Sequence, residues 1–233
     1  MRGLQGLNAK LAYLRKIGAE HQPHSGRTLY RHLLGTAQLL ERWECTSILC
    51  DVGLMHSVGG TRSFRWAPRA TDLQADLPAL LDDEALRLIG LFSAARRGGA
   101  LLDAWENGCV VLRLGEAEEH EAAVSREDLR ALILVECANL VEQGRGRSFV
   151  VRLLGKPWCD EVLGEKARDF LERHLCDTAV ALPAFSGNEF SHGYLLKDDN
   201  DLAASIRSRV APLSAIGPAA MAERRLVRAL IES

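Results

Sequence analysis

The stretches "TLYRHLLGTAQLLERW" (Thr28–Trp43) and "TSILCDVGLMHS" (Thr46–Ser57) decide the fold of this chain. Apolar residues recur three and four positions apart in both stretches, and this spacing predicts two helices. Each stretch begins with a threonine, and Thr28 and Thr46 are therefore predicted N-caps. Because few residues separate the two stretches, the helices should pack against each other as an antiparallel pair.

Helical patterns continue on both sides of this pair. Leucines at helical spacing predict a helix at the N-terminus, and Ser125 followed by Asp128 resembles a capping box that opens a long helix. Residues 109–114 and 119–124 predict two short strands joined by a turn. We therefore expect an all-α bundle with a small β-hairpin insertion near residues 108–124.

The chain should divide into a helical domain and an extension. Residues 1–150 are expected to form the domain, and residues 151–233 a helical C-terminal extension packed on it, with weaker helical patterns near 199–210 and 218–231. The extension is also a candidate surface for a homodimer.

Composition excludes several classes of partner. The 233 residues carry a net charge of −2, so bulk charge predicts neither a nucleic-acid nor a membrane partner. We find no apolar run of about 18 residues, which a membrane span requires. The six cysteines are scattered and form no CxxC pair, which favours free thiols and a cytoplasmic location.

The predicted helix pair places two histidines together. His32 lies early in the first helix and His56 at the end of the second, so antiparallel packing should bring them close. Imidazole is a common ligand for transition metals, and it is also the side chain best suited to acid–base chemistry near neutral pH. The pair therefore marks a candidate pocket.

Three motifs carry a resemblance to a known family: "SGRTLYRH" (Ser25–His32), "GLMHS" (Gly53–Ser57) and "CANLVEQ" (Cys137–Gln143). Over roughly residues 5–145 the chain resembles the HD superfamily of metal-dependent phosphohydrolases, above all the (p)ppGpp hydrolase domains. It is also similar to a group of uncharacterised small HD-like proteins that share the His-Ser pair. The resemblance implies an HD-domain-like bundle with a divalent metal held near His32 and His56.

The chain departs from this family where charge matters. Ser57 stands where the family has an aspartate after its histidine, and Asn139 stands where it has its last aspartate. Hard cations such as Mg²⁺ prefer carboxylates, so we do not expect ordinary (p)ppGpp hydrolysis. Glu136 precedes Asn139 by three positions, and with the two histidines it would complete a 2-His-1-carboxylate set that suits Fe(II). The alternative for Glu136 is a solvated or salt-bridged carboxylate.

The expected site residues fall into three groups. Catalytic roles are assigned to His32, His56 and Ser57, and metal ligation to His32, His56 and Glu136. Substrate contacts are assigned to Arg27, Tyr30, Thr61 and Asn139. Simpler alternatives exist for several of them: Arg27 as a surface arginine, Tyr30 as a packing residue, and Ser57 and Thr61 as helix caps.

These residues predict a small-molecule enzyme that acts on an anionic metabolite. The cofactor would be a divalent metal (Fe, Mn or Zn) in a metal-dependent hydrolase or oxygenase. If no metal binds, the histidines would act as acid–base groups. The alternative, from another class, is a catalytically inactive HD-like ligand-binding or protein-interaction module.

Overall fold

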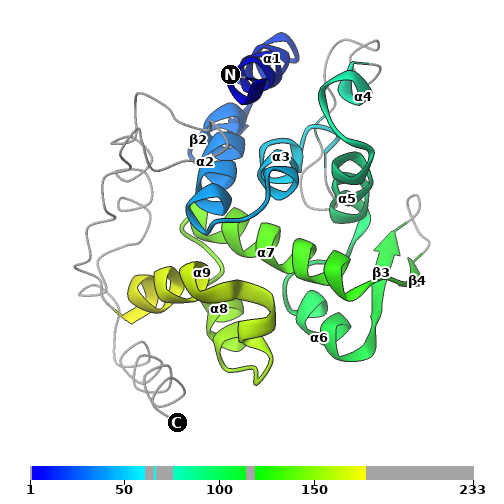
Figure 1. Ribbon diagram of the computed structural model, residues 1–233, viewed down its shortest axis with the longest axis vertical. Coiled ribbons are helices and arrows are strands. Elements are labelled where there is room, and N and C mark those ends of the chain that lie inside the picture. Colours follow the sequence, from blue (N-terminus) through cyan, green and yellow to red (C-terminus); the bar gives the residue numbers. More distant parts are fainter. Residues whose placement is uncertain (1, 61–65, 67–75, 114–118, 177–233) are drawn as a thin grey trace.

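The chain is described by a computed structural model that places residues 2–60, 66, 76–113 and 119–176 (Figure 1). Over these ranges the protein is mainly α-helical with small antiparallel β-hairpins, as the sequence predicts. The helices of the first half are α1 (Arg2–Lys16), α2 (Leu29–Arg42), α3 (Ser47–Met55), α4 (Leu77–Leu80) and α5 (Asp83–Ala94). Those of the second half are α6 (Gly99–Asn107), α7 (Arg126–Glu142), α8 (Arg147–Leu154) and α9 (Cys159–Cys176).

The predicted helix starts are confirmed. The hydroxyl oxygen of Thr28 accepts from the Arg31 amide, and that of Thr46 accepts from the Leu49 amide, each at 3.4 Å. At the start of α7, the Ser125 hydroxyl accepts from the Asp128 amide at 3.0 Å. Each side chain satisfies a backbone N–H that has no partner within its own helix.

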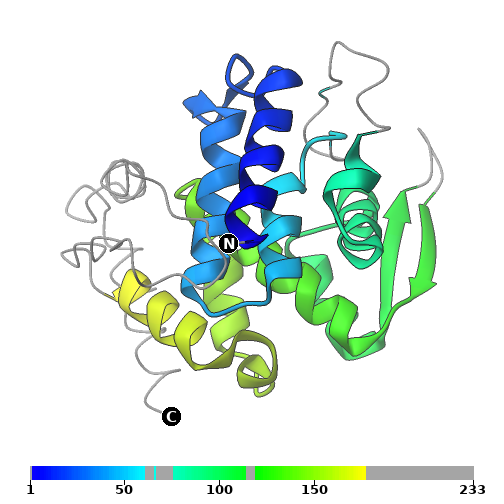
Figure 2. The ribbon, with the colours of Figure 1, turned by 45° about the horizontal axis from the view of Figure 1, so that its top comes forward.

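The structure contains two antiparallel hairpins in the described ranges. The predicted one pairs β3 (Cys109–Arg113) with β4 (Glu119–Ala123), and it lies at one edge of the molecule beside α5 and α6 (Figure 2). A second, very short one pairs β1 (Pro23–His24) with β2 (Arg27–Thr28). Its turn residues, Ser25 and Gly26, both have positive φ angles of +48° and +82°, as tight hairpin turns require.

Helix α7 is the centre of the fold. It contacts α2, α3, α5, α6, α8 and α9, and Figure 1 shows it running through the middle of the bundle. Its side chains from Leu129 to Glu142 are almost all buried, on every face of the helix. A helix in this position presents any polar side chain to the interior, so its few polar residues need partners there.

Helices α2 and α3 approach each other closely at Gly53. A Cβ atom at that position would lie 2.5 Å from Leu40 Cδ1 and 3.4 Å from the backbone of Ala37. Glycine therefore allows a helix contact that a larger residue would push apart. This contact determines how near the end of α3 comes to the first turn of α2.

The part of the extension that the structure describes packs into the core. Leu153 and Leu154 of α8 and Val162 and Leu171 of α9 are buried in the same apolar cluster as the first helices. Two predicted helical patterns, near residues 199–210 and 218–231, lie outside the described residues.

Two further expectations concern the class of protein. In the described ranges, no helix is both long enough and apolar enough to cross a membrane. Cys45, Cys50, Cys109, Cys137 and Cys159 are free thiols, as predicted, and all of these but Cys109 are buried.

Candidate functional site

His32 is fixed between two helices. It lies in the first turn of α2, just after the Thr28 cap, and its side chain is 0% exposed. Its Nδ1 atom makes a short hydrogen bond to the carboxylate of Glu142, on the last turn of α7. An ionised carboxylate can only accept, so this contact favours a proton on Nδ1 and directs Nε2 the other way.

His56 is fixed in the same manner by the backbone. It caps the C-terminus of α3, is 1% exposed, and its Nδ1 donates to the carbonyl oxygen of Gly53 at 2.8 Å. Because a carbonyl oxygen can only accept, Nδ1 of His56 carries the proton and Nε2 carries a lone pair. Phe92 of α5 packs edge-on against the ring, with the centroids 5.3 Å apart.

The two histidines face each other through their Nε2 atoms. These atoms lie 3.2 Å apart, and the ring planes are nearly perpendicular, at 84°. A hydrogen bond at this distance needs a proton on one of the two Nε2 atoms, because two lone pairs facing each other would repel. The structure thus brings His32 and His56 together at hydrogen-bonding distance.

A third histidine covers this pair. His24, at the end of β1, packs its ring on that of His32 with centroids 4.5 Å apart and planes tilted by 30°. The turn that follows places Ser25 so that its hydroxyl donates to Gln143 Oε1 at 2.8 Å. The short hairpin is therefore attached to both α2 and the end of α7.

A chain of hydrogen bonds runs along α7 beside the histidines. Gln143 Nε2 donates to Asn139 Oδ1 at 2.8 Å, and Asn139 Nδ2 donates to Glu136 Oε2 at 3.1 Å. The same Glu136 oxygen accepts from Arg97 Nη1 at 3.4 Å. Glu136 is thus a salt-bridged buried carboxylate, which is the simpler of the two alternatives that the sequence leaves open.

Burial dominates the electrostatics of the site. It lowers the pKa of His56 to about 3, and the charges of Arg97 and His24 act in the same direction, while hydrogen bonds with Gly53 and Asn139 oppose it. His56 is therefore a neutral imidazole near pH 7, the form that binds metals. Burial also raises the pKa of Glu136, against the opposing effects of Arg97, Asn139 and the Gly98 amide.

The remaining predicted site residues are placed as follows. Ser57 is buried directly after His56, and Asn139 reaches the same histidine from α7. Tyr30 faces away from the pair: its hydroxyl accepts from Arg15 Nη2 of α1 at 2.9 Å, which fits the packing alternative. Arg27 forms part of β2, where its backbone pairs with that of His24. Thr61 lies outside the described residues.

The histidine pair does not belong to a larger set of ligands in the described ranges. No group of three or more His, Cys, Asp or Glu side chains there is arranged to hold a metal ion. Glu136 instead accepts hydrogen bonds from Arg97 and Asn139. The predicted set of His32, His56 and Glu136 is therefore not formed in this structure, and the metal-ligand roles of the two histidines stay predictions.

Sequence reasoning assigned no role to several residues of the site. These are His24, Arg97, Glu142 and Gln143, which contact the predicted residues in the structure. Helical spacing offers one signal, because Glu136, Asn139 and Glu142 follow each other at intervals of three along α7. The partner of Glu142 lies 110 residues away, and no local pattern reveals it.

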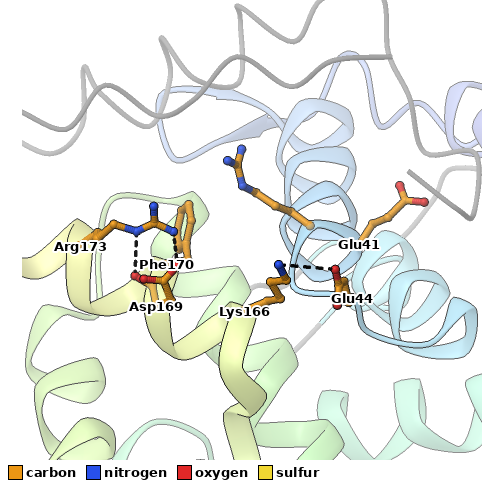
Figure 3. Close-up of a pocket in the computed structure, with 7 residues that line it drawn as sticks. Glu41, Glu44, Lys166, Asp169, Phe170 and Arg173 are labelled. Atoms are coloured by element: carbon orange, nitrogen blue, oxygen red, sulfur yellow. Dashed lines mark hydrogen bonds and ion pairs between the residues drawn. The ribbon is translucent and has the colours of Figure 1, made fainter. Parts of the chain in front are cut away.

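A separate surface pocket lies at the other end of α2 (Figure 3). It has a volume of about 400 Å³ and is lined by Glu41, Arg42, Glu44, Lys166, Asp169, Phe170 and Arg173. Ion pairs join Lys166 to Glu44 at 3.9 Å and Arg173 to Asp169. None of the predicted site residues lines this pocket.

Comparisons with known proteins place one match on the chain. The model of a family described only as a domain of unknown function (DUF6817) matches residues 13–97. That segment contains both His32 and His56, and it ends at Arg97, before α7 begins. No curated protein and no solved structure matches the chain.

Proposed function

We propose that this protein is a metal-dependent enzyme that acts on a small anionic metabolite through a divergent HD-type pocket. The observation that carries the proposal is the pair of Nε2 atoms of His32 and His56, which lie 3.2 Å apart with both Nδ1 atoms held by acceptors. Metal-binding histidines characteristically donate their other ring nitrogen to a carboxylate or a backbone carbonyl. Both kinds of acceptor are present here, as Glu142 and Gly53.

The spacing of the pair fits a shared ion. Imidazole nitrogens bind zinc at about 2.0–2.1 Å, and two such ligands at right or tetrahedral angles lie about 2.8–3.4 Å apart. The observed separation of 3.2 Å falls inside this interval. A bound divalent ion would supply a Lewis acid at the pocket, and its identity would decide between hydrolysis and oxygenation.

The chain's own residues would carry the other tasks. His32 and His56 would hold the ion, and their burial would exclude water from its surroundings. Ser57 and Asn139 would offer neutral oxygen atoms where the resembling hydrolases have carboxylates. Arg27 would anchor the anion of the substrate, as the resemblance implies.

The first test is the metal content of the purified protein. The full chain would be prepared without added metal or chelator and compared with His32→Ala, His56→Ala and His120→Ala by mass spectrometry. His120 is an exposed residue of β4 and serves as the control. The proposal expects iron, manganese or zinc at near one ion per chain in the wild type and in His120→Ala, and its loss in the other two.

Acid–base catalysis is the second candidate, and the contact between Glu142 and His32 favours it. Glu142, His32 and His56 form a continuous line of hydrogen bonds, an arrangement that can orient an imidazole and move a proton. Absence of metal from all four proteins, even after incubation with excess ions, would reject metal dependence. Turnover of an anionic metabolite that His32→Ala abolishes would then support this candidate.

A binding module remains the alternative from another class. Its support is the hydrogen-bonded chain from Ser25 to Glu136, which ties the polar residues of α7 to one another. A module of this kind should keep its affinity for a metabolite when His56 is replaced by alanine. An enzyme should lose turnover in the same variant.

A further inference from the structure

We propose that the outer edge of β4 is a docking surface for an extended segment of a partner protein in which lysine or arginine alternates with apolar residues. The partner strand would add to the β3–β4 hairpin by antiparallel pairing, the mode of binding called β-augmentation. This surface is separate from the histidine pair and independent of the proposed function.

The side of β4 that faces away from β3 has no strand beside it in the described ranges. The sheet order is β3–β4, and β4 lies at the edge of the molecule in both views (Figures 1 and 2). The other side of β3 is already occupied by the chain after α5, where the Arg96 amide donates to the Val111 carbonyl oxygen at 2.8 Å. In the part of the chain that the structure describes, β4 is therefore the edge that another strand can extend.

The pairing of the hairpin shows which backbone groups of β4 point outward. Just after β4, the Val124 amide donates to the carbonyl oxygen of Gly108 at 3.3 Å, so these two residues form a hydrogen-bonded pair. Hydrogen-bonded and non-hydrogen-bonded pairs alternate along an antiparallel ladder. Glu121 and Ala123 belong to the other class, so their N–H and C=O groups point away from β3. Val111, the partner of Glu121, likewise turns its carbonyl oxygen away from β4.

The side chains of β4 divide between two faces of the hairpin. Ala122 lies opposite Val110, on the face toward the core, where Val110 is 1% exposed. Glu119, Glu121 and Ala123 alternate with Ala122 and lie on the exposed face. A strand added beside β4 would continue both faces, so its apolar side chains should lie beside Ala122 and its basic ones beside Glu121.

Charge selects among the strands that could use this edge. Opposite charges on neighbouring strands stabilise their pairing, and like charges directly opposite each other destabilise it. A second copy of the chain is therefore a poor occupant. Symmetric antiparallel pairing centred on His120 would place Glu119 opposite Glu121, and pairing centred on Glu121 would place that residue opposite itself. A basic strand meets the opposite charge in the same positions.

The probe is a synthetic peptide, acetyl-Val-Lys-Val-Lys-Val-Lys-Val-amide, whose lysines can lie opposite residues 119, 121 and 123. Two methylated forms separate strand pairing from charge attraction. In a strand that pairs with Glu121, the lysine amides point toward β4 and the valine amides point away. Methyl groups on the lysine backbone nitrogens therefore block pairing, whereas methyl groups on the valine backbone nitrogens leave it intact. All three peptides carry the same charge.

The proteins compared are the full wild-type chain, Glu121→Lys and Glu165→Lys. Glu165 is an exposed glutamate of α9, a helix that lies away from the hairpin in Figure 1, and it is the matched control. Both substitutions change the net charge by the same amount. Binding is measured by the fluorescence anisotropy of labelled peptides.

We expect the unmethylated peptide to bind the wild type and Glu165→Lys equally, and Glu121→Lys about 3–10-fold more weakly. Methylation of the lysine amides should weaken binding to the wild type by at least about 10-fold, because it removes backbone hydrogen bonds. Methylation of the valine amides should change little. No binding of the unmethylated peptide would reject the docking surface. Equal binding of all three peptides would show charge attraction without strand pairing and would overturn the proposal.

Hydrogen exchange locates the contact without any variant. The peptide should slow the exchange of the Glu121 and Ala123 amides, which point outward, and leave that of Ala122, which points toward β3, unchanged. Unaltered exchange at Glu121 and Ala123 would contradict docking at this edge. Light scattering tests the other occupant: a dimer of the wild-type chain that the peptide dissociates would assign the edge to a second copy instead.

Discussion

Arg97 stabilises a carboxylate that would otherwise be costly to bury. Its guanidinium lies 3.4 Å from Glu136 and stacks over the Phe92 ring, with a centroid distance of 4.6 Å. Phe92 in turn packs against the ring of His56. The ion pair is therefore linked by direct contacts to the histidine pair.

Replacing Arg97 by methionine should destabilise the protein by about 3 kcal/mol, because it leaves Glu136 as an uncompensated charge in the interior. Urea denaturation at pH 7 measures the loss. Adding Glu136→Gln to that variant should recover part of the stability. Purely additive losses in the double variant would contradict this account. Arg173→Met removes an exposed ion pair within α9 and should cost little by comparison.

At this scale the sequence predicted which histidines meet but not what orients them. The proximity of His32, His56 and Asn139 follows from helix periodicity and from the family resemblance. Glu142 and Arg97 escaped because a charged residue on a helix is usually solvated, and only the packing of α7 at the centre makes these two side chains interior. For Tyr30 the sequence left a substrate contact and a packing role open, and its hydrogen bond with Arg15 of α1 fits the packing role.

At the scale of elements, the close contact between α2 and α3 depends on Gly53. Gly53→Ala should destabilise the protein by about 1–3 kcal/mol, because the new methyl group would overlap Leu40. Gly90→Ala makes the same change at an exposed position of α5 with no atom within 4 Å. It should stabilise by about 0.5–1 kcal/mol through helix propensity. Thermal denaturation of both variants tests the contact, and equal effects would contradict it.

Helices α5 and α7 are joined at the surface by Arg87 and Asp128, whose two hydrogen bonds measure 2.6 and 2.9 Å. Arg87 holds the pKa of Asp128 below its usual range, helped by Ser125. As the pH falls, Asp128 therefore becomes protonated at a higher pH in the unfolded chain than in the folded protein. The resulting stability is present above about pH 4, the usual range for aspartate, and is lost as the pH falls through the lower folded value.

Asp128→Asn should accordingly cost about 1 kcal/mol near pH 7 and progressively less below pH 4. Chemical denaturation across this pH range provides the measurement. Asp103→Asn, on α6, is the comparison, because it removes a more exposed carboxylate that makes a single, longer ion pair with Arg152 at 3.3 Å. A cost that did not change with pH would show that the ion pair is not its source.

The elements that the sequence did not predict lack a local sequence signal. Helices α6 and α8 have glycines with positive φ, Gly98 and Gly146, at their N-cap positions, so neither has the side-chain cap that marked α2, α3 and α7. The short β1–β2 hairpin has strands of two residues, too few for alternation to be seen. The caps and the longer hairpin were predictable because their signals are local.

For the whole molecule, the core of the described residues extends from α1 to α9. Buried apolar side chains occur from Leu7 to Leu171 and form one cluster. A chain that ends at Gly146 would lack α8 and α9 and expose the side chains beneath them, so it should lose its cooperative unfolding transition. A chain that ends at Cys176 should keep that transition. Calorimetry of both shortened chains tests the extent of the core. Light scattering of the chain that ends at Cys176, compared with the full chain, tests the expected homodimer.

A helix with six neighbours has no side from which it can open alone. Local fluctuations that free the ends of a bundle cannot expose the buried part of α7, from Leu129 to Glu142, so the amide hydrogens of this part should exchange with solvent only when the whole domain unfolds. Glu136, Asn139 and Glu142 are carried by this helix. These three polar residues should therefore stay in place for as long as the domain is folded. Any opening that admits a ligand must come from the parts of α2 and α3 next to His32 and His56.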